Sequence, residues 1–151
     1  MAKKTKNINY YEGVGRRKQS VALVRLYLVK KGSHVVVNKA EIKPGEIYIN
    51  GKSSNTTSLK SYQKTFLSLP LTLTNSQDRF AISINVSGGG TTGQLDAMVH
   101  GLARALNLVD RETYRPLLKA NGLLTRDPRK KETRKVGTGG KARRVKQSPK
   151  R

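Results

Sequence analysis

The sequence predicts a small α+β domain that continues into a long basic tail, and three features of the chain support this prediction. Segments rich in β-branched and aromatic residues fill much of the first half, which is typical of strands. A glycine-rich turn then leads into a segment with a clear helical pattern. The last 26 residues hold almost no apolar side chains, so they cannot contribute to a core. We therefore expect one domain in which helices pack on one face of a sheet.

The charge is distributed unevenly over three parts of the chain. The N-terminal segment (1–18) has a net charge of +5, the α+β core (19–125) has +7, and the C-terminal arm (126–151) has +10. The total of +22 is high for 151 residues, and such repulsion opposes a compact state unless an anionic partner offsets it. Nucleic acid is the simplest partner of this kind.

The first strands are predicted from apolar runs and turn residues. Residues 8–12 form a short strand, and Gly13 and Gly15 bracket a turn after it. Residues 21–29 are almost continuously apolar, with Arg25 as the single charged interruption, so they predict a central strand.

The middle of the chain alternates between short apolar stretches and polar ones. A turn at 30–33 precedes a strand that begins at 34–37. A short apolar stretch at 46–50 is followed by a polar loop at 52–58. Strict alternation over residues 79–86 predicts a half-buried strand.

The segment 59–73 lies between the polar loop and this last strand, and its pattern is ambiguous. Its apolar residues Leu59, Tyr62, Phe66 and Leu69 fit one face of a helix, and Pro70 would then close that helix.

The clearest helix follows the glycine-rich turn. Its apolar residues recur at helical spacing along a single stripe. They are Leu95, Met98, Val99, Leu102, Ala103 and Leu106. We expect Thr91 or Thr92 to cap the first turn of this helix.

A shorter helix is predicted near residues 111–120. Asp110 is its expected N-cap, because a carboxylate at that position accepts from free backbone N–H groups. Pro116 would interrupt the helix and Gly122 would end it.

The glycine turn, defined by Gly88, Gly89 and Gly90, is a candidate phosphate site. It precedes a helix start, where free N–H groups and the helix dipole favour an anion. The turn lacks the Lys-Ser/Thr ending of a Walker A loop, so nucleotide binding is weakly supported and a backbone phosphate fits as well. Alternatively, the glycines only make a tight turn.

Two further basic regions are candidates for phosphate binding. Arg16, Arg17 and Lys18 form a cluster whose guanidinium groups can fork onto phosphates, or which is simply solvated. The arm has two basic blocks around a glycine joint at 137–140 and no aromatic residue, which favours phosphate contact over base stacking. Alternatively, the arm is a solvated tail that only aids solubility. Alone we expect the arm to be disordered, and to order against an anionic surface.

Several functions are disfavoured by composition. The chain has no cysteine, two histidines and nine scattered carboxylates, so we expect no catalytic site, no metal site and no cofactor. A phosphotransfer enzyme using the glycine turn is disfavoured, since no group nearby would hold a metal. The chain has no apolar run long enough to span a membrane and no apolar secretory segment.

Five blocks of sequence, in this order, resemble one protein family. They are GVGRRKQSVA at 13–22, VSGGGTTGQ at 86–94, HGLARAL at 100–106, LTRDPR at 124–129, and KARR at 141–144 with the terminal Lys150 and Arg151. Together they are similar to the ninth protein of the small ribosomal subunit in its bacterial and organellar form. The resemblance extends from about residue 10 to the last residue.

The resemblance implies a structural ribosomal protein, not an enzyme. The implied fold is a mostly four-stranded sheet with helices on one face, as in the second domain of the fifth small-subunit protein. The implied partners are the rRNA of the subunit head, neighbouring small-subunit proteins and the peptidyl-site tRNA. The arm would reach that tRNA with Lys150 and Arg151.

The rRNA-binding residues expected from the basic clusters and the resemblance form a larger set. They are Arg16, Arg17, Lys18, Gly88, Gly89, Gly90, Arg126, Arg129, Lys130, Lys131, Arg134, Lys135, Lys141, Arg143 and Arg144.

The chain departs from the family pattern near its end. Ser148 and Pro149 stand where an aromatic residue and Ser are usual, so an aromatic contact there is not expected. The segments 44–48 and 114–117 look most like cyanobacterial and plastid members, and stretches rich in Asn, Lys, Thr, Ser and Ile suit an AT-rich plastid genome. Together they predict a chloroplast stromal ribosome, with the bacterial cytoplasm as the alternative. The alternative function is a free nucleic-acid-binding protein of the RNA-chaperone or DNA-compacting type, because it would share the same electrostatics.

Overall fold

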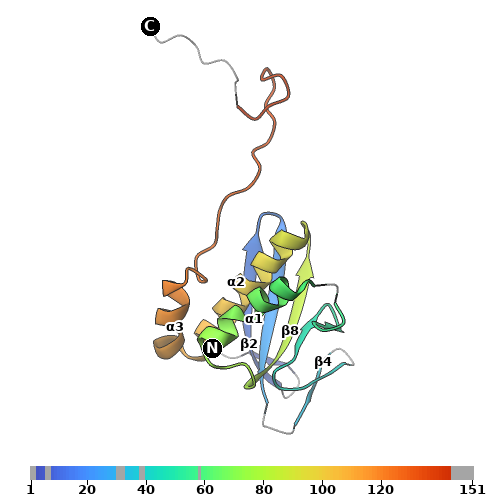
Figure 1. The fold of residues 1–151 in the computed structure, drawn as a ribbon, viewed down its shortest axis with the longest axis vertical. Coiled ribbons are helices and arrows are strands. Elements are labelled where there is room, and N and C mark those ends of the chain that lie inside the picture. Colours follow the sequence, from blue (N-terminus) through green and yellow to red (C-terminus); the bar gives the residue numbers. More distant parts are fainter. Residues whose placement is uncertain (1–2, 6–7, 30–32, 38–39, 58, 144–151) are drawn as a thin grey trace.

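The main feature of the protein is a six-stranded mixed sheet, seen in a computed structural model that describes residues 3–5, 8–29, 33–37, 40–57 and 59–143 (Figure 1). In spatial order the strands are β1 (Lys3–Thr5), β2 (Ile8–Arg17), β3 (Ser20–Leu28), β8 (Phe80–Ser87), β6 (Ile47–Ile49) and β7 (Lys52–Ser53). Neighbours are antiparallel except β6 and β8, which are parallel. The α+β class is confirmed. The sheet has six strands rather than mostly four, because the very short β1 and β7 extend its two edges.

Three helices accompany the sheet: α1 (Ser61–Leu73), α2 (Thr91–Val109) and α3 (Arg111–Ala120). The longest, α2, lies across β2 and β3, and both α1 and α3 contact it (Figure 1). All six residues of the predicted α2 stripe are buried, so that prediction is confirmed. The segment 59–73 is mostly helical, which resolves its ambiguity.

A close approach of two backbones explains why β2 continues through Gly13 and Gly15, where we expected a turn. A side chain at Gly13 would lie 2.3 Å from the carbonyl oxygen of Gly101, and one at Gly15 would lie 1.9 Å from that of Ala97. The glycines therefore let β2 touch α2. The chain turns later, at Lys18, whose φ is 51°.

Two predicted helix boundaries and one predicted interruption are wrong. The N-cap of α2 is Gly90, with no side-chain hydrogen bond, whereas Thr91 already lies in the helix. Pro70 and Pro116 lie inside α1 and α3 and do not end or interrupt them. Each proline removes one backbone hydrogen bond, and burial of neighbours such as Leu118 outweighs that loss.

The predicted ends of α3 are confirmed. The carboxylate of Asp110 accepts from the backbone N–H of Thr113 at 3.1 Å. Gly122, with φ of 69°, donates to Lys119 O at 3.0 Å, and Leu123 N–H donates to Leu118 O at 3.0 Å. This pair of bonds is the Schellman motif that glycine allows, and it aims the chain toward the arm.

Hydrophobic residues are buried on both faces of the sheet. Phe80, Ile82 and Ile84 of β8 lie under the helices with Leu102 and Leu106 of α2, and all five are fully buried. Burying each such side chain stabilises the fold by about 1.5–3 kcal/mol.

A smaller cluster lies on the other face, where Tyr10 and Tyr27 pack with Ile42. Ile42 belongs to a separate two-stranded sheet of β4 (Val35–Val37) and β5 (Ala40–Ile42). Arg25 occupies this face because its guanidinium pairs with Glu12 at 3.2 Å. The predicted polar loop at 52–58 is wrong at its start, since Lys52 and Ser53 pair with β6. Most of the predicted turn at 30–33 lies outside the described residues.

Candidate nucleic-acid interface

A hollow of about 650 Å³ brings together three regions that are far apart in the sequence. Its lining residues come from the β2–β3 turn, from the glycine turn with the start of α2, and from the arm. They are Lys18, Gln19, Ser20, Gly89, Gly90, Thr91, Thr92, Gly93, Lys130 and Lys131. We call this hollow the basic groove. Three lysines and an uncapped helix start face it, so its chemistry favours an anion.

The glycine turn owes its shape to Ser20, which is buried at the start of β3. The Ser20 hydroxyl donates to Gly88 O at 3.1 Å, and the Gln94 side-chain amide donates to the same oxygen at 3.1 Å. Gly88 and Gly89 have φ of 74° and 63°, and a side chain at Gly89 would meet Ser20 Oγ at 2.2 Å. These two glycines therefore serve the fold. A side chain at Gly90 would meet no atom within 4 Å, so Gly90 lies open to the groove.

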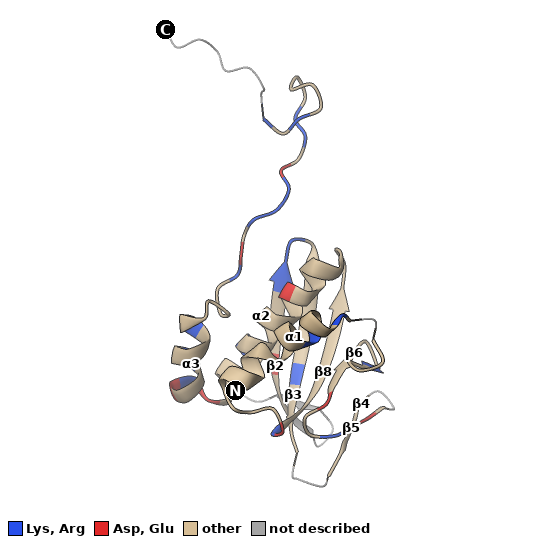
Figure 2. Ribbon diagram, viewed as in Figure 1, with Lys and Arg blue, Asp and Glu red and all other residues tan. Residues whose placement is uncertain are grey.

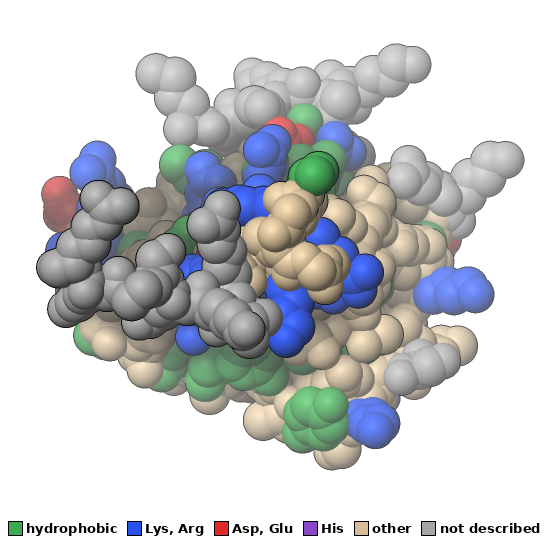
Figure 3. All heavy atoms as spheres, turned by 90° about the horizontal axis from the view of Figure 1, so that it is seen from above, with side chains coloured by type: hydrophobic (Ala, Val, Ile, Leu, Met, Phe, Trp, Pro, Cys, Tyr) green, Lys and Arg blue, Asp and Glu red, His purple; other side chains and the backbone are tan. Residues whose placement is uncertain are grey.

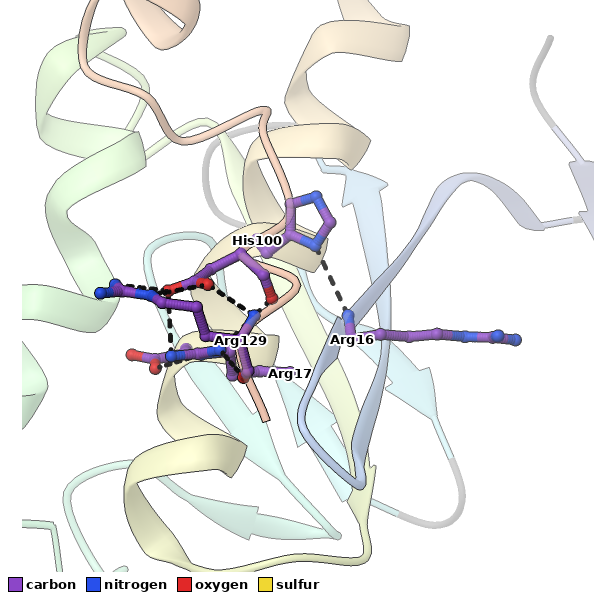
Figure 4. Close-up of polar contacts among 6 residues, drawn as sticks. Arg16, Arg17, His100 and Arg129 are labelled. Carbon is purple, nitrogen blue, oxygen red and sulfur yellow. Dashed lines mark hydrogen bonds and ion pairs between the residues drawn. The ribbon is translucent and has the colours of Figure 1, made fainter. Parts of the chain in front are cut away.

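The predicted basic cluster at the end of β2 divides into outward and inward side chains (Figure 4). Arg16 and Lys18 are exposed. The Arg17 side chain is only 14% exposed, and its guanidinium lies 3.3 Å from an Asp96 carboxylate oxygen and 3.0 Å from one of Asp127. Arg17 Nη1 also donates to the carbonyl oxygens of Asp127 and Arg129, at 3.3 and 2.6 Å.

Asp127 organises the first residues of the arm. Its carboxylate accepts from the Arg129 guanidinium at 2.7 Å and from the Arg129 backbone N–H at 2.9 Å. These bonds from Arg129, with a smaller contribution from Arg17, hold the pKa of Asp127 well below its ordinary value. The carboxylate is therefore charged throughout the physiological pH range.

His100 joins α2 to the end of β2 (Figure 4). The Arg16 N–H donates to His100 Nδ1 at 3.5 Å, which requires that nitrogen to be unprotonated. Burial lowers the pKa of His100, and the positive charges of Arg104 and Arg126 lower it further. His100 and Arg126 line a hollow beside the root of the arm, which the sequence did not predict.

Most of the remaining described arm residues are exposed, and basic residues recur along the arm (Figure 2). Arg134, Lys135 and Lys141 are exposed, and Arg143 is 81% exposed although it pairs with Glu132. Seen from above, basic side chains gather near the middle of the visible face (Figure 3). Arg144, Lys150 and Arg151 lie outside the described residues.

Asp96, Asp127 and Ser20 are structurally important residues that the sequence analysis did not single out. Scattered carboxylates carry no spacing signal, and Arg17, which both Asp96 and Asp127 contact, is 79 and 110 positions away from them. The signal for Asp127 is that a very basic chain keeps two acidic residues, Asp127 and Glu132, within its arm.

The described residues contain no group of three His, Asp or Glu side chains placed to hold a metal ion. Within the same ranges, no helix combines the length and the apolar character that crossing a bilayer requires.

Comparison with known protein families assigns the chain to one of them. The family model described as ribosomal protein S9/S16 matches residues 15–151, so the chain belongs to this family. The resemblance found in the sequence is thereby confirmed. The chain is a structural ribosomal protein of the small subunit that binds rRNA and acts in translation.

Proposed function

From membership of the S9/S16 family, we propose that this protein binds the rRNA of the subunit head through the basic groove and the arm. We further propose that the end of the arm, Lys150 and Arg151, contacts the peptidyl-site tRNA. The body then anchors the protein on rRNA, and the arm links that anchor to the site of decoding.

The convergence of two basic segments and a helix start on one groove is the observation that carries the rRNA proposal. Lys18 comes from the β2–β3 turn, whereas Lys130 and Lys131 come from the arm, more than 100 residues later. Between them lie the unpaired N–H groups at the start of α2, since its N-cap, Gly90, has no capping side chain. A phosphate in the groove would meet both ammonium groups and backbone donors.

Exposed cations outside the groove extend this interface. Arg16, Arg134, Lys135 and Lys141 are exposed and suited to phosphates of a folded RNA. Arg126 lines the hollow beside His100, where a further phosphate could lie. Arg129 and Arg143 keep outward-facing donors despite their carboxylate partners.

The rRNA proposal is tested by the salt dependence of binding. In the triple variant Lys18→Gln, Lys130→Gln, Lys131→Gln, the slope of log K against log salt for a head-domain rRNA transcript should fall by about 2–3, near one per lost phosphate contact. The matched control neutralises Lys43, Lys52 and Lys119, which are exposed but do not line the groove. An equal loss in the control would mean that the groove has no special part in binding.

The tRNA proposal is tested by removing residues 146–151. We expect small subunits to assemble almost normally with this variant and to bind peptidyl-site tRNA more weakly. Assembly is read by sedimentation after a high-salt wash, and tRNA affinity by filter binding. Blocked assembly with normal tRNA affinity would contradict this division of labour.

We also propose the chloroplast stroma as the location of this ribosome, with the bacterial cytoplasm as the alternative. The segments 44–48 and 114–117 resemble both cyanobacterial and plastid members, and the stretches rich in Asn, Lys, Thr, Ser and Ile, which suit an AT-rich plastid genome, support the first. Fractionation of the source cells should find the protein with plastid ribosomes, and its recovery with bacterial ribosomes would favour the second.

A further inference from the structure

We infer that Arg17 is an intramolecular anchor that sets the direction in which the arm leaves the body, and is not itself a phosphate ligand. Neither the family match nor the basic sequence pattern assigns this role. The sequence groups Arg17 with its neighbours Arg16 and Lys18 as one basic cluster, and the structure separates it from them.

All three nitrogens of the Arg17 guanidinium already face acceptors of this chain. Nε lies 3.3 Å from Asp96 Oδ2 on α2, and Nη2 lies 3.0 Å from Asp127 Oδ2. Nη1 donates to two arm carbonyl oxygens, those of Asp127 and Arg129. A phosphate could reach this guanidinium only by displacing acceptors that hold it from three sides.

The charge around Arg17 is also balanced. Arg17 and Arg129 are the two cations of the cluster, and Asp96 and Asp127 are its two anions. This gives a locally neutral spot in a chain of net charge +22, and it uses two of the nine carboxylates. A cluster with no net charge attracts polyanions only weakly. The ion pairs within it are nevertheless strong, because the Arg17 side chain is mostly shielded from solvent.

The anchor lies where control over the arm is greatest. Within the part of the chain that the structure describes, the hydrogen bonds found beyond Arg129 stay inside the arm, such as that from Lys135 N–H to Lys141 O at 3.2 Å. The 14 residues from 130 to 143 span at most about 50 Å, so a change of about 20° at the root moves their end by up to about 17 Å. Arg17 therefore links β2, α2 and the arm at its pivot.

The conformational part of this inference is tested without RNA, so its outcome does not depend on the proposed function. The chain has no cysteine, so Ser61→Cys and Thr133→Cys would carry the only two spin labels, and both positions are exposed. Arg17→Lys keeps the charge but cannot reach both carboxylates and both carbonyls at once. We expect the distance distribution from double electron–electron resonance to broaden or shift by at least several ångströms.

Arg16→Lys is the matched control, since Arg16 is adjacent, exposed and outside the ion-pair cluster. Asp96→Asn, which changes the anchor from the α2 side, should broaden the distribution as Arg17→Lys does. Circular dichroism establishes that each variant keeps the fold. An unchanged distribution in both anchor variants, or an equal change in the control, would overturn the inference.

The functional part rests on the proposed function and uses rRNA binding by the full-length chain. Arg16→Gln should lower the salt slope by about 1, as expected for a lost phosphate contact. Arg17→Gln should leave the slope nearly unchanged and weaken binding about tenfold at every salt concentration, because the RNA must then order a less restricted arm. A fall in slope equal to that of Arg16→Gln would show that Arg17 is a phosphate ligand and refute its assignment as an anchor. If neither variant binds rRNA differently, the proposed interface fails while the resonance result stands.

Discussion

The body and the arm keep their conformations by different means. In the body, α2 and β8 bury most of their apolar faces, and residues such as Leu102 and Ile84 are fully shielded from water. In the arm, Val136 is entirely exposed, and the described contacts are hydrogen bonds and ion pairs of backbone and charged groups. Burial supplies most of the folding free energy, whereas exposed ion pairs contribute little.

This difference teaches that the two regions of one chain depend on different conditions. The body should fold without a partner, because its core is its own. We expect the arm to need an anionic surface to become ordered along its length, because in the structure Arg17 contacts only its first residues. Substitutions in the body should therefore change the free energy of unfolding, whereas substitutions in the arm should change the affinity for rRNA.

Removing residues 126–151 should give the largest effect, and on binding only. The deletion removes 12 of the 31 basic residues, so affinity for head-domain rRNA should fall at least about 1,000-fold at moderate salt. Filter binding over a salt series measures the loss, and thermal unfolding followed by circular dichroism should stay close to that of the full chain. Loss of the folded body with the arm would break the comparison.

Leu102→Ala should have the largest effect on stability. Leu102 is fully buried between the helices and the sheet, so the cavity should lower the free energy of unfolding by about 3 kcal/mol. Val136→Ala removes apolar atoms from the exposed arm and should change the free energy of unfolding by less than about 0.5 kcal/mol. Urea denaturation measures both. Similar losses at the two positions would mean that the arm packs like the body.

Gly15→Ala should destabilise the body by about 2 kcal/mol, because its methyl group would collide with the backbone of α2 at Ala97. Gly90→Ala is the control, since a methyl group there meets no neighbour. It should cost no more than about 1 kcal/mol, because Gly90 is the N-cap of α2 and alanine is a poorer N-cap than glycine. If the two variants were equally stable, the close contact between β2 and α2 would not be a determinant of the fold.

The sequence predicted the parts of this fold that depend on apolar periodicity. The α2 stripe and β8 were found because one face of each is buried, and burial imposes a period of 3.6 or 2. The Asp110 cap was found because it acts on its own helix, three residues away. Local rules were sufficient where the partner is near in the sequence.

Contacts between distant segments were missed because the same residue types have two uses. Gly13 and Gly15 predicted a turn, and only the position of Gly101 on α2 shows that they allow close packing. Arg17 looked like its neighbours, and its inward direction follows from Asp96 and Asp127, which no spacing rule connects to it. The basic groove was likewise predicted as three separate elements, since its assembly requires the tertiary fold.

The smallest expected effect is a pH dependence at the junction of the two regions, where His100 packs beside the root of the arm. Burial lowers the pKa of His100 in the folded state, so the fold favours the neutral imidazole that accepts from Arg16 N–H. Below about pH 6.5, the unfolded chain binds a proton that the folded chain resists, so stability falls as the pH falls from that value through the lowered pKa. Above pH 6.5 this contribution is fully present.

His100→Gln should abolish this part of the pH dependence, because glutamine can accept and donate in similar positions without titrating in this range. The free energy of unfolding is measured by urea denaturation at pH 5 and pH 7.5, and the difference between the two values should be smaller in the variant. His34→Gln is the control, since His34 is the only other histidine and lies on the exposed β4 side, away from α2. If His34→Gln reduced the difference and His100→Gln did not, the junction would not be the pH-sensitive element, and the link between body and arm would rest on the Arg17 ion pairs alone.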